Sequence, residues 1–323
     1  MSVRPRKIVY FLAPVAVLAV LFLAGPKVQV TEAYVPLAPD VDVQAWVAEK
    51  AAEFPDIIPL TEDRLILADS TGRTPWSVVY IHGFSGSAGM AYPFVDSLAA
   101  RMNANAYVPR LAGHGRRADV LGDATQAEWL QDTANAIEIA SRLGDRVLLV
   151  ALSNGAPLGL WAAVQPELNE QIGAIVLLSP NIAPADPKSD MLLWPWGTQL
   201  ARMILGERRQ WDAYTEAHGL YSTNDYETRV LPQMMACVEL LRQQDLDALK
   251  APVLVMYSDQ DEVISPEAIT EFFGHIPTAK KLVEVGNVGD PNNHLIVGDA
   301  LSPEETIPAV EEVLTFLNGL QTR

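Results

Sequence analysis

Cysteine and histidine are scarce in this 323-residue sequence. It contains a single cysteine, Cys237, so it can form neither a disulfide within the chain nor a cysteine-rich metal site. We expect this thiol to be buried and structural. Only five histidines are present, so a histidine-dependent reaction has few candidate bases. The sequence predicts no metal ion and no organic cofactor.

Basic residues are also in the minority. There are 23 lysines and arginines against 40 aspartates and glutamates, which gives a formal net charge of -17. No basic patch is visible that would attract a polyanion, so the sequence argues against nucleic acid as a partner. The hydrophobic share of 49% and the charged share of 20% are ordinary for a globular chain with a sizeable core.

Long apolar runs are missing except at the N-terminus. There, the uncharged run Ile8–Ala24 follows Arg4, Arg6 and Lys7. The run is longer than a typical signal-peptide core and slightly shorter than the roughly 20 residues that a membrane span needs. We predict that residues 1–26 are an uncleaved signal-anchor, with the remaining chain on the non-cytoplasmic (periplasmic or extracellular) side of a membrane. A cleaved signal peptide, and hence a secreted protein, is the alternative.

The rest of the chain divides into a tether and one large domain. Residues 27–61 contain several prolines and a short amphipathic helix, Val43–Phe54, which we expect to pack on the main domain. In residues 62–323, apolar strands alternate with helices, which predicts a mostly parallel α/β sheet of about eight strands, covered on both faces. The strands expected are Arg64–Ala68, Ser77–Ile81, Ala106–Val108, Val147–Ala151, Ala174–Leu178, Val253–Tyr257 and Lys281–Val285.

One of these strands leads directly into Ala151-Leu152-Ser153-Asn154-Gly155. A serine with small residues two positions before and after it, between a buried strand and an apolar helix, predicts a nucleophile elbow. Such a turn lifts the serine hydroxyl clear of the sheet. Ala151 stands where glycine is usual, which is a mild departure. A serine that merely caps the following helix is the alternative.

A second turn, His82-Gly83-Phe84-Ser85-Gly86, ends another buried strand. A glycine-rich turn of this kind aims a backbone N–H into the space beside the nucleophile. Acyl transfer needs two such donors for the developing oxyanion. We assign them to Phe84 and to Asn154, the residue after the serine.

With these motifs in this order, the chain resembles the α/β-hydrolase superfamily, and within it bacterial carboxylesterases and monoacylglycerol lipases. The resemblance covers roughly residues 64–320. Arg110-Leu111-Ala112-Gly113-His114-Gly115 is similar to the family's Gly-His-Gly turn, and Glu128-Trp129 through Asp132 is similar to the start of the helix before the elbow strand. The resemblance implies the α/β-hydrolase fold, with the active site at the carboxyl ends of the strands.

The histidine of the active site can be sought by elimination. His82 and His114 belong to the two glycine turns, upstream of the serine, whereas the family's chain order is serine, acid, histidine. His218 and His275 are expected to be surface or packing residues. His294 lies in the loop between the last strand and the final helix, so we predict it as the general base.

The acid is expected in Ser258-Asp259-Gln260-Asp261-Glu262-Val263, directly after a strand. The family's pattern of a small residue, two variable positions, aspartate, one variable position and valine aligns on Asp261. The resemblance therefore implies Asp261 as the acid that orients the imidazole. Asp259 is the alternative, and Asp290 is a weaker one.

About seventy residues separate the strand ending at Leu178 from the strand beginning at Val253. A connection this long should carry structure of its own. In this position it resembles the family's helical cap, at about 180–250. We predict that the apolar residues Trp194 and Trp196 bind substrate by lining an acyl pocket or facing lipid; packing of the cap on the core is the alternative. We expect residues 230–249 to be the helix that returns the chain to the sheet.

Together these residues predict a serine hydrolase that cleaves carboxylic esters, of short to medium acyl chains or of monoacylglycerol-like lipids, through an acyl-enzyme on Ser153. Thioesterases, lactonases, amidases and carbon–carbon bond hydrolases use the same triad and stay open as alternatives. A serine at the elbow argues against haloalkane dehalogenases and epoxide hydrolases, which use aspartate there. A non-catalytic, membrane-tethered binding protein on the same fold is the remaining alternative.

Overall fold

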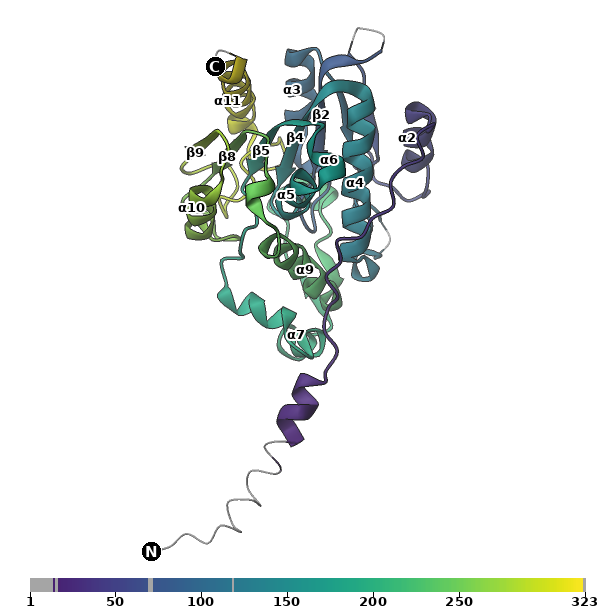
Figure 1. Cartoon of the computed structure of the whole chain (residues 1–323). Coiled ribbons are helices and arrows are strands. Elements are labelled where there is room, and N and C mark those ends of the chain that lie inside the picture. The colour runs from purple at the N-terminus through teal and green to yellow at the C-terminus, as the bar shows by residue number, and fades with distance from the viewer. Residues whose placement is uncertain (1–13, 15–16, 69–71, 118, 322–323) are drawn as a thin grey trace, which may run out of the picture.

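A seven-stranded sheet forms the centre of the computed structural model, which describes residue 14 and residues 17–68, 72–117 and 119–321 (Figure 1). The strand order is β1-β3-β2-β4-β5-β8-β9, and all neighbouring strands are parallel except β1 and β3. The strands are β1 (Arg64–Ile66), β2 (Thr74–Ile81), β3 (Asn105–Val108), β4 (Gly144–Leu152), β5 (Ile172–Leu178), β8 (Val253–Tyr257) and β9 (Lys280–Glu284). The mostly parallel α/β sheet is thus confirmed, with seven strands where about eight were expected.

The central strands are unbroken apolar runs because both faces of the sheet are buried. In β4, Leu149 and Ala151 face one core cluster, whereas Leu148 and Val150 face the other. Helices supply the remaining apolar groups of each cluster. The helices are α3 (Phe94–Met102) and α11 (Pro303–Gln321) on one face, and α4 (Gln126–Leu143), α5 (Gly155–Val164) and α10 (Pro266–His275) on the other, with the short α6 (Pro166–Asn169) after α5.

The connection between β5 and β8 carries structure of its own, as expected from its length. Its elements are η3 (Pro187–Leu193), α7 (Gly197–Leu205), β6 (Arg208–Gln210), α8 (Glu216–Tyr221), β7 (Asp225–Glu227), η4 (Thr228–Val230), α9 (Leu231–Arg242) and η5 (Leu246–Ala248). β6 and β7 pair as a separate antiparallel sheet of two strands.

The helix expected over residues 230–249 is shorter than predicted. α9 ends at Arg242, and Asp245 then begins the turn η5 because its side chain accepts a hydrogen bond from Asp247 N. Cys237 and Leu240 of α9 belong to the same core cluster as α4 and α5. α9 is therefore part of the core, and the lone thiol is buried as expected.

Residues 31–38, which we call the strap, run along the outside of α4. Gln126 bonds both backbone groups of Thr31, at 3.0 Å each. Gln131 does the same for Val35, at 2.8 Å each. Two glutamine side chains thus hold the strap in the way that a neighbouring strand would.

Two further short 3-10 helices, η1 (Ala88–Ala91) and η2 (Leu121–Asp123), lie later in the chain.

The strap leads into α2 (Val43–Ala51), which Asp42 caps by accepting a hydrogen bond from Ala45 N. Val47 of α2 is buried in the main core, so the short helix packs on the domain as expected. The helix ends at Ala51, three residues before the predicted Phe54.

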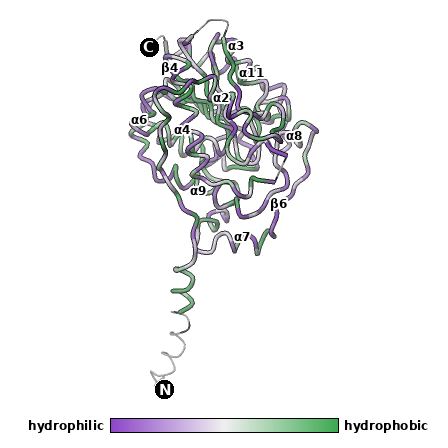
Figure 2. Tube along the Cα trace, turned by 90° about the vertical axis from the view of Figure 1, so that its right-hand side faces the viewer, coloured by the Kyte–Doolittle hydropathy of each residue, from purple (hydrophilic) through white to green (hydrophobic). Residues whose placement is uncertain are grey.

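Residues 8–13, 15 and 16 of the predicted membrane segment Ile8–Ala24 lie outside the described residues, and the prediction stays untested there. Residues 17–23 are helical and apolar (Figure 2). Within the described ranges, no helix is both long enough and apolar enough to cross a membrane.

Candidate active site

Ser153 stands at the sharp turn between β4 and α5. Its φ of 52° lies in the left-handed region, the strained backbone that a nucleophile elbow requires. Gly155 is needed because a Cβ there would lie 2.3 Å from the carbonyl oxygen of Ile81. Ala151 is tolerated because it faces Gly159 of α5, where even an added Cβ would stay 3.4 Å from the alanine methyl.

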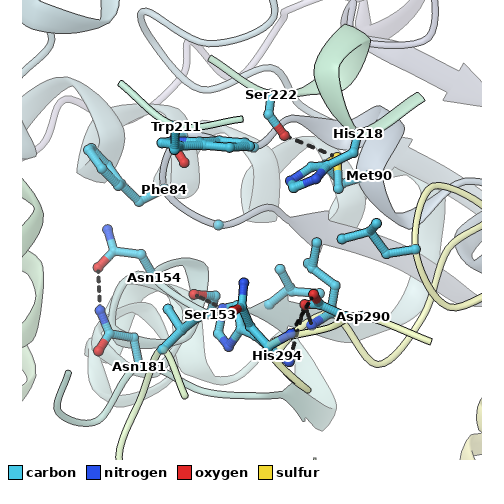
Figure 3. A pocket seen from close by; sticks show the side chains of 18 of the residues that line it. Phe84, Met90, Ser153, Asn154, Asn181, Trp211, His218, Ser222, Asp290 and His294 are labelled. Carbon is cyan, nitrogen blue, oxygen red and sulfur yellow. Dashed lines mark hydrogen bonds between the residues drawn. The ribbon is translucent and has the colours of Figure 1, made fainter. Parts of the chain in front are cut away.

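The structure brings the predicted serine, acid and histidine into one hydrogen-bonded series. Ser153 Oγ lies 2.9 Å from His294 Nε2, and His294 Nδ1 lies 2.8 Å from Asp261 Oδ2 (Figure 3 shows the serine and the histidine). All three side chains are buried at the carboxyl edge of the sheet. The other oxygen of Asp261 accepts hydrogen bonds from Val263 N and Ile264 N, which fix the orientation of the carboxylate.

The two alternative acids do not contact the histidine ring. Asp259 is exposed. Asp290 is buried, but its carboxylate accepts backbone N–H groups of Asn292, His294 and Leu295, at 3.0, 3.2 and 2.8 Å. Asp290 therefore shapes the loop that carries His294.

Phe84 and Asn154, the predicted oxyanion donors, line the same cavity as Ser153. Neither backbone N–H donates to another group among the described residues. A hydrogen bond fixes the Asn154 side chain, because its Oδ1 accepts from Asn181 Nδ2 at 3.3 Å. The nearby Cys237 thiol donates to Gln233 O at 3.6 Å, and burial raises its pKa to about 12.

Two buried histidines support the turn that carries Phe84. His82 Nδ1 donates to Gly83 O at 2.9 Å, and its Nε2 accepts from Leu111 N at 3.1 Å. His114 packs against His82 and Phe84, with ring centroids 4.9 and 6.3 Å away. Burial lowers the pKa of His82 to about 4 and that of His114 well below its usual range, so both rings are neutral. Their role is to hold the turn.

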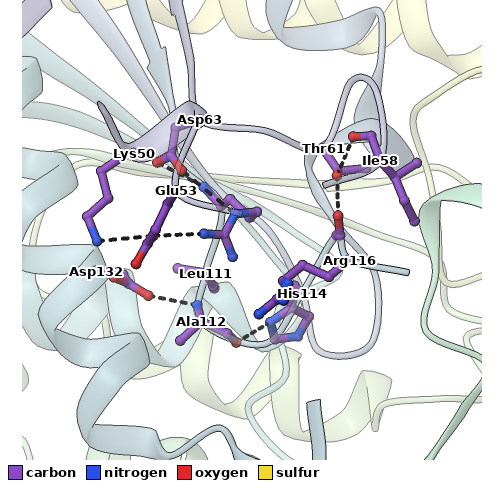
Figure 4. A network of polar contacts seen from close by, with 12 residues as sticks. Lys50, Glu53, Ile58, Thr61, Asp63, Leu111, Ala112, His114, Arg116 and Asp132 are labelled. Atoms are coloured by element: carbon purple, nitrogen blue, oxygen red, sulfur yellow. Dashed lines mark hydrogen bonds and ion pairs between the residues drawn. The ribbon is translucent and has the colours of Figure 1, made fainter. Parts of the chain in front are cut away.

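The two further motifs form one network that includes His114, and Figure 4 shows Asp132, Ala112 and His114 within it. Ala112 N donates to the half-buried carboxyl of Asp132 at 2.8 Å, and Ala112 O accepts from His114 Nδ1 and from Trp129 Nε1, both at 2.9 Å. Burial raises the pKa of Asp132 to about 7. The aromatic-acidic start of α4 thus fixes the Gly-His-Gly turn.

A cavity of about 400 Å³ opens above Ser153, within the size range of small-molecule sites. Its walls are mainly apolar, and include Phe84, Met90, Trp211, Tyr226, Met234 and Leu295. Within the described ranges, no group of three or more histidine, cysteine or acidic side chains could hold a metal ion.

The predicted substrate-binding residues Trp194 and Trp196 do not line this cavity. They are 48% and 39% exposed, and contact the N-terminal helix instead: the Trp194 ring lies edge-on to Phe22, and Trp196 Nε1 donates to Leu21 O at 3.2 Å. The physical reason is that η3 and α7 pack against α9 and η4, and the two rings lie on the side that faces the N-terminal helix.

The cap residues that do line the cavity come later in the chain. They include Trp211, Tyr214 and His218, of which the histidine was expected to be surface or packing. No helical periodicity points to Trp211 and Tyr214, because both lie in the irregular segment before α8.

Known proteins resemble this chain in sequence and in fold. The model of the alpha/beta hydrolase family matches residues 78–309, a range that contains Ser153, Asp261 and His294. Among curated proteins, the thermostable monoacylglycerol lipase of Bacillus sp. (strain H-257) is 25% identical over 222 residues, which cover 66% of this chain and 82% of that protein.

Solved structures share the fold. A structure of metagenome-derived lipolytic enzymes aligns with a TM-score of 0.64 and 20% identity, over 81% of this chain and 99% of that chain. The monoacylglycerol lipase of Paleococcus ferrophilus aligns with a TM-score of 0.58 and 18% identity, over 79% of this chain and 97% of that chain.

Proposed function

The chain belongs to the alpha/beta hydrolase family, and we propose that it is a serine hydrolase that cleaves carboxylic esters through an acyl-enzyme on Ser153. The observation that carries the proposal is the unbroken hydrogen-bonded series from Asp261 through His294 to Ser153. The similarity to lipolytic enzymes supports an ester or lipid as the small-molecule substrate.

In the proposed reaction, His294 Nε2 takes the hydroxyl proton of Ser153 as Oγ attacks the ester carbonyl. Asp261 holds the proton on Nδ1 and stabilises the imidazolium that forms. The N–H groups of Phe84 and Asn154 bind the tetrahedral oxyanion. The alcohol leaves with a proton from His294, and water then hydrolyses the acyl-enzyme by the same route.

The size and lining of the cavity support esters of short to medium acyl chains, or monoacylglycerol-like lipids, as the proposed substrates. A volume of about 400 Å³ with mainly apolar walls favours an alkyl chain over a charged or strongly hydrated one. No feature of the cavity favours a thioester, a lactone, an amide or a carbon–carbon bond over an ester.

A fluorophosphonate label together with chromogenic esters of increasing acyl length tests the proposal. The label should attach to Ser153, and Ser153→Ala should lose both the label and ester turnover, by about 10⁴-fold or more. Ser189→Ala, in η3 outside the cavity, is the matched control and should keep both. Retained turnover in Ser153→Ala would contradict the mechanism.

A further inference from the structure

His218 lines the cavity but has no part in the proposed reaction. It belongs to α8, in the cap, and its side chain is only 8% exposed. Figure 3 places it on the Asp290 side of the cavity, across from Phe84 and Asn154. The ring thus stands over the part of the site that lies away from the proposed oxyanion donors.

The hydrogen bonds of His218 fix which ring nitrogen carries the proton. Tyr214 N donates to Nδ1 at 3.3 Å, so Nδ1 is an acceptor and a neutral ring carries its proton on Nε2. Burial lowers the pKa of His218, against a smaller opposing effect of Asp290, and so favours the neutral ring. Nε2 has no hydrogen-bond partner among the described residues. It is therefore an N–H donor left for a ligand.

Aromatic neighbours hold the ring in place. Trp211 lies with its ring centroid 4.7 Å from that of His218, and the Tyr214 ring stacks on the histidine at 5.6 Å with an interplanar angle of 20°. These contacts restrict the orientation of the imidazole. The edge of the His218 ring that carries Nε2 is the part left to make a polar contact.

The segment around α8 is bonded to the core at both of its ends. Thr215 Oγ1 donates to Ala300 O at 2.9 Å, beyond the loop that carries His294. Thr223 N donates to Ser85 O at 2.6 Å, next to the proposed oxyanion donor Phe84. The position of His218 is thus fixed relative to both halves of the site, which a specific contact requires.

The proposed reaction determines which part of the substrate reaches His218. His294 must return its proton to the departing alcohol, so the alcohol lies on the histidine side of the site, opposite the oxyanion donors. His218 stands on that side, with Asp290 and His294 (Figure 3). A buried donor that a substrate leaves unpaired costs free energy, so such a donor discriminates between leaving groups.

We propose that His218 selects esters whose alcohol carries a second oxygen acceptor, the ether or hydroxyl oxygen of a diol or polyol monoester, by donating Nε2–H to it. The inference deepens the proposed function and rests on it. His218 is a specificity residue here, since it forms and breaks no bond of the ester.

Two butyrate esters that differ by one atom test this inference. 2-Methoxyethyl butyrate and n-butyl butyrate have leaving groups of equal length, and only the first offers an acceptor oxygen. The ratio of their kcat/KM values should exceed the ratio of their alkaline hydrolysis rates by about 3- to 10-fold, the effect of one neutral hydrogen bond. A wild-type ratio equal to the alkaline ratio overturns the inference without any variant.

The variants assign the preference to the ring. His218→Phe keeps a stacked ring without a donor and should bring the ratio down to the alkaline value, whereas His218→Gln keeps a donor and should restore part of it. The preference between butyryl and hexanoyl p-nitrophenyl esters should not change in either variant. An unchanged ratio in a folded His218→Phe also overturns the inference.

The two proposals fail in different ways. If the wild-type chain hydrolyses neither ester and takes no fluorophosphonate label, the proposed function is wrong. If it takes the label and hydrolyses both esters at the alkaline ratio, the serine mechanism stands and only the role of His218 is wrong.

Discussion

Two pairs of histidines near the candidate active site differ in what surrounds them. His82 and His114, which we call the turn pair, are each 1% exposed and bond to backbone groups. His294 and His218, the pocket pair, are 9% and 8% exposed and direct Nε2 at Ser153 or at the cavity. The two roles that we propose for the pocket pair rest on a ring nitrogen that faces Ser153 or the cavity, and not on burial alone.

The largest expected effect is on the orientation of the His294 ring. Asp261→Asn should lower kcat by about 10⁴-fold near neutral pH, because the amide no longer holds the His294 proton on Nδ1. Asp259→Asn, at an exposed position two residues away, is the matched control and should change kcat by less than about twofold. Steady-state kinetics with p-nitrophenyl butyrate measure both. The reverse outcome would reassign the acid.

The turn pair should respond in stability. His82→Ala leaves Leu111 N without its acceptor and opens a cavity in the core, so the free energy of unfolding should fall by roughly 2–4 kcal/mol. Urea unfolding followed by tryptophan fluorescence measures the change. His275→Ala, in an exposed position on α10, is the control and should alter stability little. If His82→Ala is as stable as the wild type, His82 does not support the turn that carries Phe84.

A smaller effect concerns the pH dependence of stability beneath the turn pair. Burial raises the pKa of Asp132 from 3.8 to about 7, so the folded chain keeps a proton that the unfolded chain releases in this window. Its contribution to stability therefore falls as the pH rises from about 4 to 7. His82 acts oppositely: its pKa falls from 6.5 to about 4, so stability is lost as the pH drops through that range.

Asp132→Asn separates these opposing effects, because it keeps an acceptor for Ala112 N and removes the titration. Between pH 5 and 7, the free energy of unfolding of the variant should decline less than that of the wild type, by on the order of 1 kcal/mol. Urea unfolding at pH 5, 6 and 7 gives the comparison. Parallel curves for the two chains would mean that Asp132 is ionised in the fold.

The sequence was sufficient to predict which side chains meet at the end of the sheet. In a parallel sheet, every loop that follows a strand lies at the same edge, so motif and chain order alone predicted that Ser153, Asp261 and His294 lie together. Ala151 was a departure that only the structure explains, because the glycine that accommodates it, Gly159, lies eight residues away on α5.

The cap was harder to predict because its elements are short and have little periodicity. α8 has six residues and η3 is a 3-10 helix, so neither has an apolar face that indicates which side is inward. Apolar composition alone pointed to Trp194, which packs against the N-terminal helix. Exposed apolar side chains are common, so composition could not separate it from Trp211, which lines the cavity.

The strap also determines how the chain opens locally. Its hydrogen bonds to Gln131 are exposed, and detaching it breaks no bond of the sheet. The amide proton of Val35 should therefore exchange with solvent through a small local opening, whereas that of Leu149 in β4 should exchange only when the core unfolds. We therefore expect the strap to open before the sheet does, and hydrogen exchange at these two amides measures the difference.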